Sequence, residues 1–103
     1  MKVTWDPKAS IGKRKIANYI RRSFGLDRVK RFRQEVDQTI DMIMCHPNLG
    51  PIDPLFDDRP KTYRSVIING LSKMVYFIDD DSIYIAAFWD CRQDPKKQAS
   101  KVK

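Results

Sequence analysis

The sequence predicts an α+β fold of order β-α-α-β-β-β, in which a helical hairpin packs on one face of an antiparallel sheet. Two observations carry the prediction. Residues 7–46 place apolar side chains at helical spacing, and residues 62–89 form three apolar runs divided by turn residues. The chain has 103 residues, 42% hydrophobic and 32% charged, which is typical of one soluble domain with a modest core. We expect this domain over residues 1–95 and a basic C-terminal tail over residues 96–103.

The first expected element is a short strand over Lys2–Trp5. Asp6 is then suited to cap a helix, with Pro7 at its first helical position. Gly25 is a natural C-terminal stop for this helix. Its predicted apolar face consists of Ala9, Ile16, Ala17, Ile20 and Phe24.

A second helix is expected to start at Asp27 and to run to about His46, just before Pro47. Its apolar face consists of Val29, Phe32, Val36, Ile40 and Ile43. Because the link between the two helices is so short, they should form an antiparallel hairpin whose apolar side packs on a sheet.

Residues 47–60 contain four prolines and several acids, so a loop is expected there. The three apolar runs that follow are Thr62–Ile68, Leu71–Ile78 and Ser82–Trp89. Asn69-Gly70 between the first two is a strong signal for a two-residue type I′ turn. Three aspartates, Asp79–Asp81, make the next turn.

That type I′ turn predicts a register in which Ile68 faces Leu71. Arg64 and Lys73 would then be diagonal neighbours on one face, with their backbones about 7–8 Å apart. Two cations this close repel each other unless an anion lies between them, so the register predicts a phosphate-sized site. The alternative is that each cation pairs with a carboxylate, such as Asp57 or Asp58. A slip of one residue would place Arg64 and Lys73 on opposite faces.

The charge of the chain is unevenly distributed. Residues 1–33 carry eleven basic and two acidic side chains, residues 34–90 carry four and ten, and residues 91–103 carry five and one. A basic first third and a basic tail favour a polyanionic partner, either nucleic acid or an acidic protein, and contact with nucleic acid or the ribosome is the preferred interpretation. A solvated helix surface rich in lysine and arginine explains the same residues. The cations expected to contact nucleic acid are Lys13, Arg14, Arg21, Arg22, Lys96 and Lys97.

Other features of the sequence limit the chemistry and the location. His46 lies at a helix C-terminus, where capping is a simpler role than catalysis. Neither a metal-ligand spacing nor a glycine-rich phosphate loop is present, so we expect no metal and no cofactor. No apolar run is long enough to cross a membrane and the N-terminus has no apolar signal region, which makes the cytoplasm the expected location.

With these elements in order, the chain resembles the RelE/ParE superfamily of bacterial toxin–antitoxin toxins. The resemblance covers nearly the whole length. It rests on Trp5, IANYI with FG at residues 16–25, HPNLG at residues 46–50, and the run from YRS at residues 63–65 to RQDP at residues 92–95. The resemblance implies a small antitoxin as partner, and the basic first third predicts acidic residues in the antitoxin segment that covers it.

The resemblance also implies one of two activities. RelE-like members are metal-free endoribonucleases that cut mRNA on the ribosome, and ParE-like members poison DNA gyrase. In the nuclease branch the 2′-hydroxyl attacks the adjacent phosphate, and the matching residues are Arg64, Lys73 and Arg92. Arg64 and Arg92 would act as phosphate clamps, and Lys73 could act as a base only if neighbouring cations lowered its pKa.

One departure from the nuclease pattern concerns proton transfer. Nuclease members usually carry an aromatic or imidazole group near the C-terminus, and the residues after Arg92 include neither tyrosine nor histidine. The available substitutes are Asp94, His46, Lys96 and Lys97. On the sequence alone, ribosome-dependent RNA cleavage ranks ahead of gyrase inhibition, and an inactive antitoxin-binding module ranks third.

Overall fold

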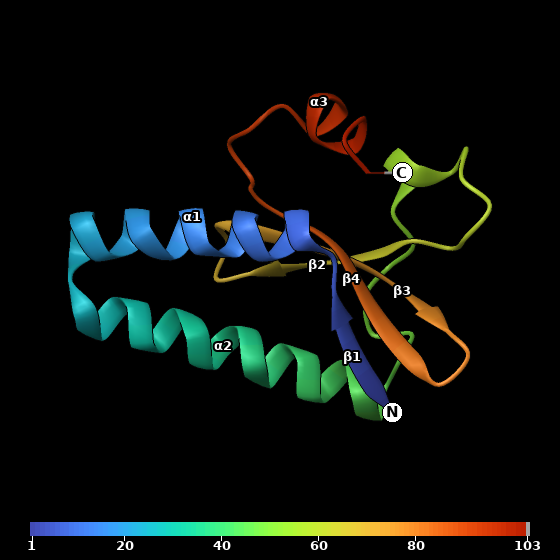
Figure 1. The fold of residues 1–103 in the computed structure, drawn as a ribbon, viewed down its shortest axis with the longest axis horizontal. Helices are drawn as coiled ribbons and strands as arrows, with labels where there is room; N and C mark the ends of the chain where they lie inside the picture. Colours follow the sequence, from blue (N-terminus) through green and yellow to red (C-terminus); the bar gives the residue numbers. More distant parts are fainter. Residues whose placement is uncertain (103) are drawn as a thin grey trace.

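The fold follows the predicted order of elements, with two additional short helices (Figure 1). The computed structural model describes residues 1–102. Its elements are β1 (Lys2–Trp5), α1 (Pro7–Phe24), α2 (Leu26–Cys45), the 3-10 helix η1 (Pro54–Phe56), β2 (Arg64–Ile68), β3 (Ser72–Asp79), β4 (Ser82–Asp90) and α3 (Pro95–Ala99). The predicted α+β class is therefore confirmed, and η1 lies within the predicted loop.

The sheet is mixed rather than wholly antiparallel. Its strand order is β1-β4-β3-β2, with β1 parallel to β4 and the other neighbours antiparallel. Two tight turns reverse the chain between β2 and β4, and β4 then closes beside β1 in the same direction. The expectation of an antiparallel sheet was wrong for this one pairing.

The two helices of the hairpin begin and end within one residue of their predicted bounds. The Asp6 carboxylate accepts a hydrogen bond from the Lys8 amide at 2.9 Å, and Pro7 opens α1. Gly25 has a φ of 90°, a backbone conformation that favours glycine, and it lets α2 start at the next residue. Both helices bury their apolar faces against the same side of the sheet.

Gly12 sets how closely α1 approaches β4. A Cβ atom built at Gly12 would lie 1.9 Å from the carbonyl oxygen of Phe88, so only glycine fits there without movement of the backbone. The rest of this contact is aliphatic and aromatic, including Ile16 on α1 and Phe88 on β4. Together these residues hold α1 firmly on the centre of the sheet.

The opposite side of the sheet carries a second core, mostly aromatic, which we call the aromatic face. Its buried members are Phe56, Tyr63, Val75, Phe77, Ala86, Ala87, Trp89 and Ala99. The rings of Phe56 and Tyr63 stack with their centroids 4.9 Å apart. Thus η1 and α3 cover a face that the sequence analysis left open (Figure 1).

The segment after Pro95 is not a free tail over its described part. Asp94 caps α3 by accepting a hydrogen bond from the Lys96 amide at 3.1 Å, and Ala99 is buried against the aromatic face. Arg59 donates hydrogen bonds to the carbonyl oxygens of Ala99 and Val102. Ala99, Val102 and Arg59 thus hold this segment against the aromatic face, which the charge of the segment did not reveal.

The predicted register of the β2–β3 hairpin is wrong by one residue. Asn69 and Gly70 have φ values of 57° and 66°, as a type I′ turn requires, but Ile68 pairs with Ser72 rather than with Leu71. The extra residue, Leu71, accepts a hydrogen bond from the Cys91 amide at 2.8 Å. Its recruitment by the end of β4 accounts for the shift.

Candidate nucleic-acid interface

The register shift separates the two cations that were expected to share an anion site. Arg64 faces Tyr76, while Lys73 faces Ile67, so the two side chains leave the sheet on opposite faces. Arg64 lies on the side of the helices, and Lys73 lies on the aromatic face. The prediction that Arg64 and Lys73 lie on one face and share an anion site is therefore wrong.

Arg64 holds a loop in place. Its Nη1 atom donates to the carbonyl oxygen of Gly50 at 2.9 Å and lies 3.5 Å from that of Asn48. The same loop is fixed by Tyr76, whose hydroxyl accepts from the Gly50 amide and donates to the Pro47 carbonyl oxygen, both at 2.9 Å. Burial raises the pKa of the Tyr76 phenol. The family-like HPNLG segment is thus anchored by β2 and β3.

Lys73 is neutralised by a carboxylate that the sequence analysis did not single out. Its Nζ lies 2.7 Å from an oxygen of Asp53, whose side chain is only 3% exposed. The same Nζ lies 5.4 Å from the centroid of the Trp89 ring. The alternative expectation, that Lys73 pairs with a carboxylate of the loop, is therefore correct, but the carboxylate is that of Asp53 and not that of Asp57 or Asp58.

Arg92 remains exposed but is oriented by its neighbours. Its Nε and Nη2 atoms donate to the Asp90 carboxylate at distances between 2.7 and 3.2 Å. Its guanidinium carbon lies 5.2 Å from the centroid of the Tyr19 ring. The hydrogen bond from Arg92 lowers the pKa of Asp90, and the bonds with Asp90 and Tyr19 raise the pKa of Arg92.

The three predicted catalytic cations do not form one cluster. Arg64 pairs with Tyr76 in the middle of β3, whereas Asp90, two residues before Arg92, pairs with Ser72 at the start of that strand. Four residues of strand separate those positions, which corresponds to about 13 Å. Lys73 is near the Arg92 end, but it points into the aromatic face.

The candidates for proton transfer are equally dispersed. Asp94 caps α3, and His46 lies exposed at the C-terminal end of α2, the position expected of a capping residue. Lys96 and Lys97 are exposed on α3. Their roles in proton transfer or nucleic-acid contact stay predictions.

A groove runs beside Arg92, between α1 and the C-terminal segment, over the outer end of β4. Its volume is about 560 Å³. Four cations line it, Lys8, Lys15, Arg92 and Lys101, with apolar side chains such as Ile11 and Trp89 beneath them. One end is tied by a 3.0 Å hydrogen bond from Lys8 Nζ to the Lys101 carbonyl oxygen. Sequence reasoning missed Tyr19 and Lys15 because only the packing of the C-terminal segment brings them beside Arg92.

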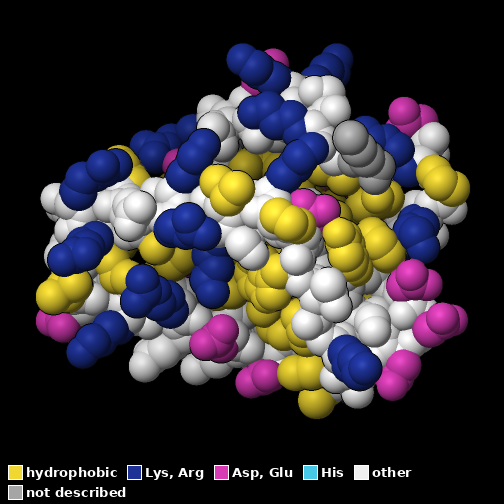
Figure 2. Space-filling model, viewed as in Figure 1, with side chains coloured by type: hydrophobic (Ala, Val, Ile, Leu, Met, Phe, Trp, Pro, Cys, Tyr) yellow, Lys and Arg dark blue, Asp and Glu magenta, His cyan; other side chains and the backbone are white. Residues whose placement is uncertain are grey.

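The cations predicted to contact nucleic acid lie on two surfaces. Arg14, Arg21 and Arg22 are exposed along α1, while Lys96 and Lys97 are exposed on α3. Lys13 is half-buried, with its Nζ 5.1 Å from the centroid of the Trp5 ring. Figure 2 shows Lys and Arg side chains gathered over the helical hairpin and over α3 on this side of the molecule.

Two negative findings apply to residues 1–102, the part of the chain that the structure describes. No group of three or more His, Cys, Asp or Glu side chains in that part of the chain is placed to hold a metal ion. None of its helices is both long enough and apolar enough to cross a membrane.

Comparison with protein families identifies the chain. The family described as the ParE toxin of the type II toxin–antitoxin system parDE matches residues 3–95, and the chain belongs to this family. The superfamily resemblance and the fold that it implied are thereby confirmed. Comparison with curated protein sequences gives no significant match.

Solved structures of toxin–antitoxin proteins share the fold. A chain of the chromosomal ParDE system from P. aeruginosa is 15% identical and has a TM-score of 0.68, with 87% of this chain and 95% of that chain covered. The YoeB dimer from Staphylococcus aureus is 22% identical with a TM-score of 0.58, covering 84% and 92%. The YoeB–YefM heterotetramer from the same organism gives the same identity and coverage with a TM-score of 0.53.

Proposed function

We propose that this toxin inhibits DNA gyrase without cleaving RNA. The observation that carries the proposal is the separation of Arg64, Lys73 and Arg92, each of which already has partners within the fold. Membership of the ParE family agrees with it. This ranking reverses the one drawn from the sequence alone, in which RNA cleavage came first.

The chemistry of RNA cleavage explains why separation matters. A nuclease of this kind stabilises a pentacoordinate phosphate with cations that are aimed at one point before the reaction. Lys73 is bound to Asp53 on one face, and Arg64 is bound to loop carbonyl oxygens on the other. Neither would reach a phosphate held by Arg92 without breaking these contacts. The geometry therefore supports an action that does not depend on a shared phosphate site.

Ribosome-dependent mRNA cleavage is the second candidate, and one observation favours it. Arg92 is exposed at the edge of a groove that also holds Lys8, Lys15 and Lys101, so a phosphate could enter there. In this alternative, Arg92 and the groove lysines, rather than Arg64 and Lys73, would contact the RNA backbone.

We also propose that the chain binds a cognate antitoxin. The charge of residues 1–33 supports a partner segment rich in acidic side chains. Two of the solved structures that share this fold come from a ParDE toxin–antitoxin system and from a heterotetrameric YoeB–YefM toxin–antitoxin complex.

One experiment separates the two activities. Purified toxin is added to gyrase in a supercoiling assay, and in parallel to a translation reaction whose mRNA is mapped by primer extension. We expect loss of supercoiling and intact mRNA. New mRNA ends that disappear in Arg92→Ala, while supercoiling is unaffected, would overturn the proposal. Arg64→Ala serves as a matched variant, because it removes an arginine far from the groove.

A further inference from the structure

The tip of the helical hairpin concentrates positive charge. We define the hairpin tip as residues 21–33, which comprise the end of α1, Gly25 and the first turns of α2. Its basic side chains are Arg21, Arg22, Arg28, Lys30, Arg31 and Arg33, all exposed, against the single acid Asp27. The tip thus carries a net charge of +5, out of +7 for the whole chain.

These cations are not used by the fold. Within residues 1–102, the ion pairs are formed by Arg59, Lys61, Lys73 and Arg92, so the tip cations have no carboxylate partner. Arg21 and Arg22 suit the C-terminal end of α1, but Arg28 lies in the first turn of α2, where a cation opposes the helix dipole. Clustered like charges also repel one another. Helix stability therefore does not explain the cluster.

Two large apolar side chains are exposed in the middle of this charge. Phe24 is 55% exposed and Leu26 is 60% exposed, on either side of Gly25. Phe24 was predicted to lie on the buried face of α1, and this prediction was wrong because the hairpin extends beyond the sheet (Figure 1). Arg28 lies over the Phe24 ring, 5.3 Å from its centroid, which keeps that ring at the surface.

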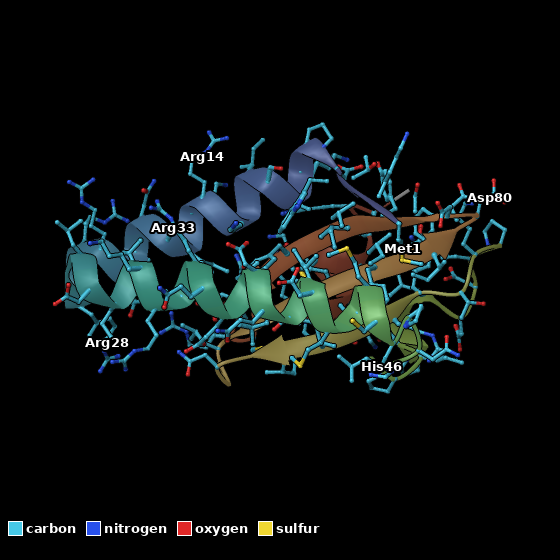
Figure 3. All side chains as sticks on the ribbon, turned by 90° about the horizontal axis from the view of Figure 1, so that it is seen from below. Met1, Arg14, Arg28, Arg33, His46 and Asp80 are labelled. Carbon is cyan, nitrogen blue, oxygen red and sulfur yellow. The ribbon has the colours of Figure 1, made fainter. Side chains whose placement is uncertain are left out.

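The tip is accessible from several sides. Figure 3 shows Arg28 pointing away from the hairpin and Arg33 lying between the two helices. Figure 2 shows the same end of the molecule covered by Lys and Arg side chains with apolar side chains among them. A partner with closely spaced negative charge and an apolar interior would match both features.

We propose that the hairpin tip binds duplex DNA, with its cations on the phosphates and Phe24 and Leu26 wedged against a base step. Duplex DNA carries one negative charge per roughly 1.7 Å of its axis, which suits six cations on one small surface. Apolar wedges flanked by cations bend DNA by partly unstacking a step. The proposal rests on the proposed function only in that gyrase would present the DNA; binding to free DNA is tested without gyrase.

The test measures binding of the full chain to a fluorescent 30-base-pair duplex over a range of salt concentrations. We expect the logarithm of the association constant to fall with the logarithm of salt at a slope of about −4.5 to −5.4, as for five or six phosphate contacts. In Arg21→Gln/Arg31→Gln the slope should become shallower by about 2. At 0.1 M salt, affinity should fall on the order of 50-fold.

A matched control removes two charges elsewhere. Lys2→Gln/Lys61→Gln has the same net charge as the tip variant, but its substitutions lie on exposed positions of β1 and the loop before β2. Binding of this control should stay close to that of the unmodified chain. Equal weakening of both variants would mean attraction by net charge alone and would overturn the proposal.

The wedge is tested by 2-aminopurine placed at the centre of the duplex. Binding of the unmodified chain should raise its fluorescence, because unstacking relieves quenching. Phe24→Ser/Leu26→Ser should keep the salt slope and lose the fluorescence increase. If the unmodified chain did not raise the 2-aminopurine fluorescence, the proposed insertion of Phe24 and Leu26 at a base step would be overturned.

If an acidic peptide bound the tip while the duplex did not, the tip would be a surface for a protein partner, and the proposal would be overturned. If the unmodified chain did not bind the duplex but still inhibited gyrase, this proposal would be refuted and the proposed function would stand.

Discussion

The hairpin tip and the aromatic face both carry lysine and arginine side chains, but among the described residues only the cations on the aromatic face pair with carboxylates or carbonyl oxygens of the fold. On the aromatic face, Lys73 pairs with Asp53, and Lys61 lies 3.5 Å from an Asp79 oxygen and 4.8 Å from the Phe77 ring centroid. Arg59 binds carbonyl oxygens of the C-terminal segment and lies over the Phe56 ring. At the tip, six cations have no carboxylate partner within the described residues 1–102.

The difference shows that a lysine or arginine is informative only together with its environment. A half-buried cation with a buried carboxylate and an aromatic ring stabilises the fold, since its removal leaves an uncompensated charge. An exposed cluster of like charges gives the fold no such stabilisation and remains available to a polyanion. The predictions below test this division, in order of expected effect.

The largest effect is expected at the Lys73–Asp53 pair. Lys73→Met leaves the Asp53 carboxylate buried without its cation, so the free energy of unfolding should fall by about 3–5 kcal/mol. Urea denaturation measures this change. Adding Asp53→Asn keeps the cap of η1 and removes the charge, so the double variant should recover much of the loss. If Lys73→Met alone were as stable as the unmodified chain, Lys73 would not stabilise the fold and this prediction would be contradicted.

The next effect is expected at Gly12, which seats the hairpin on the sheet. Gly12→Ala drives a methyl group into the Phe88 carbonyl oxygen, and overpacking of this kind costs about 1–3 kcal/mol, occasionally more. Ser23→Ala, at an exposed position of the same helix, is the control and should leave thermal unfolding nearly unchanged. An unchanged melting temperature for Gly12→Ala would contradict the close approach of α1 to β4.

An effect on stability that is no larger than at Gly12, and that depends on pH, is expected at Tyr76. Tyr76→Phe leaves the buried Gly50 amide without its partner and should cost about 1–3 kcal/mol at neutral pH. Burial raises the pKa of Tyr76 in the folded state, so the folded state holds this proton more tightly than the unfolded state does. The contribution of the protonated Tyr76 phenol to the free energy of unfolding is therefore fully present below the ordinary phenol pKa. It is lost as the pH rises through the raised pKa of the folded state.

Unfolding followed by circular dichroism from pH 8 to 11 tests the Tyr76 prediction. The unmodified chain should lose stability more steeply at the alkaline end than Tyr76→Phe does. Parallel curves for the two proteins would show that Tyr76 does not contribute to the pH dependence. Tyr84, whose pKa is raised by its hydrogen bond to Asp6, should leave a residual slope in both.

The smallest effect on stability is expected at the tip. Arg21→Gln/Arg31→Gln should change the free energy of unfolding by no more than about 0.5 kcal/mol, because both side chains are exposed and unpaired. Thermal unfolding at low and high salt measures it. A clear loss of stability would show that the fold depends on these cations.

The fold was predictable from the sequence where local signals decide the structure. Asp6-Pro7, Gly25 and the spacing from Val29 to Ile43 define the helical hairpin through capping and periodicity. The type I′ conformation of Asn69-Gly70 is likewise local. The register was not, because it depends on a hydrogen bond between Leu71 and Cys91 that only the assembled sheet provides.

The candidate site was less predictable, since each error follows from a contact distant in sequence. Asp53 is twenty positions from Lys73, and nothing local marks it as the partner. The position of Arg92 beside Tyr19 requires α1 to cross the end of β4. The basic character of the first third was visible in the sequence, but the exposure of Phe24 required knowing where the sheet ends.

The division between the two regions is tested most directly by gyrase supercoiling with two charge-matched variants. Arg21→Gln/Arg31→Gln and Lys2→Gln/Lys61→Gln are compared with the unmodified toxin at one salt concentration, after their melting temperatures have been shown to match. The account predicts that the tip variant loses most of the inhibition and that the other variant keeps it. Full inhibition by the tip variant, or equal loss in both, would contradict it.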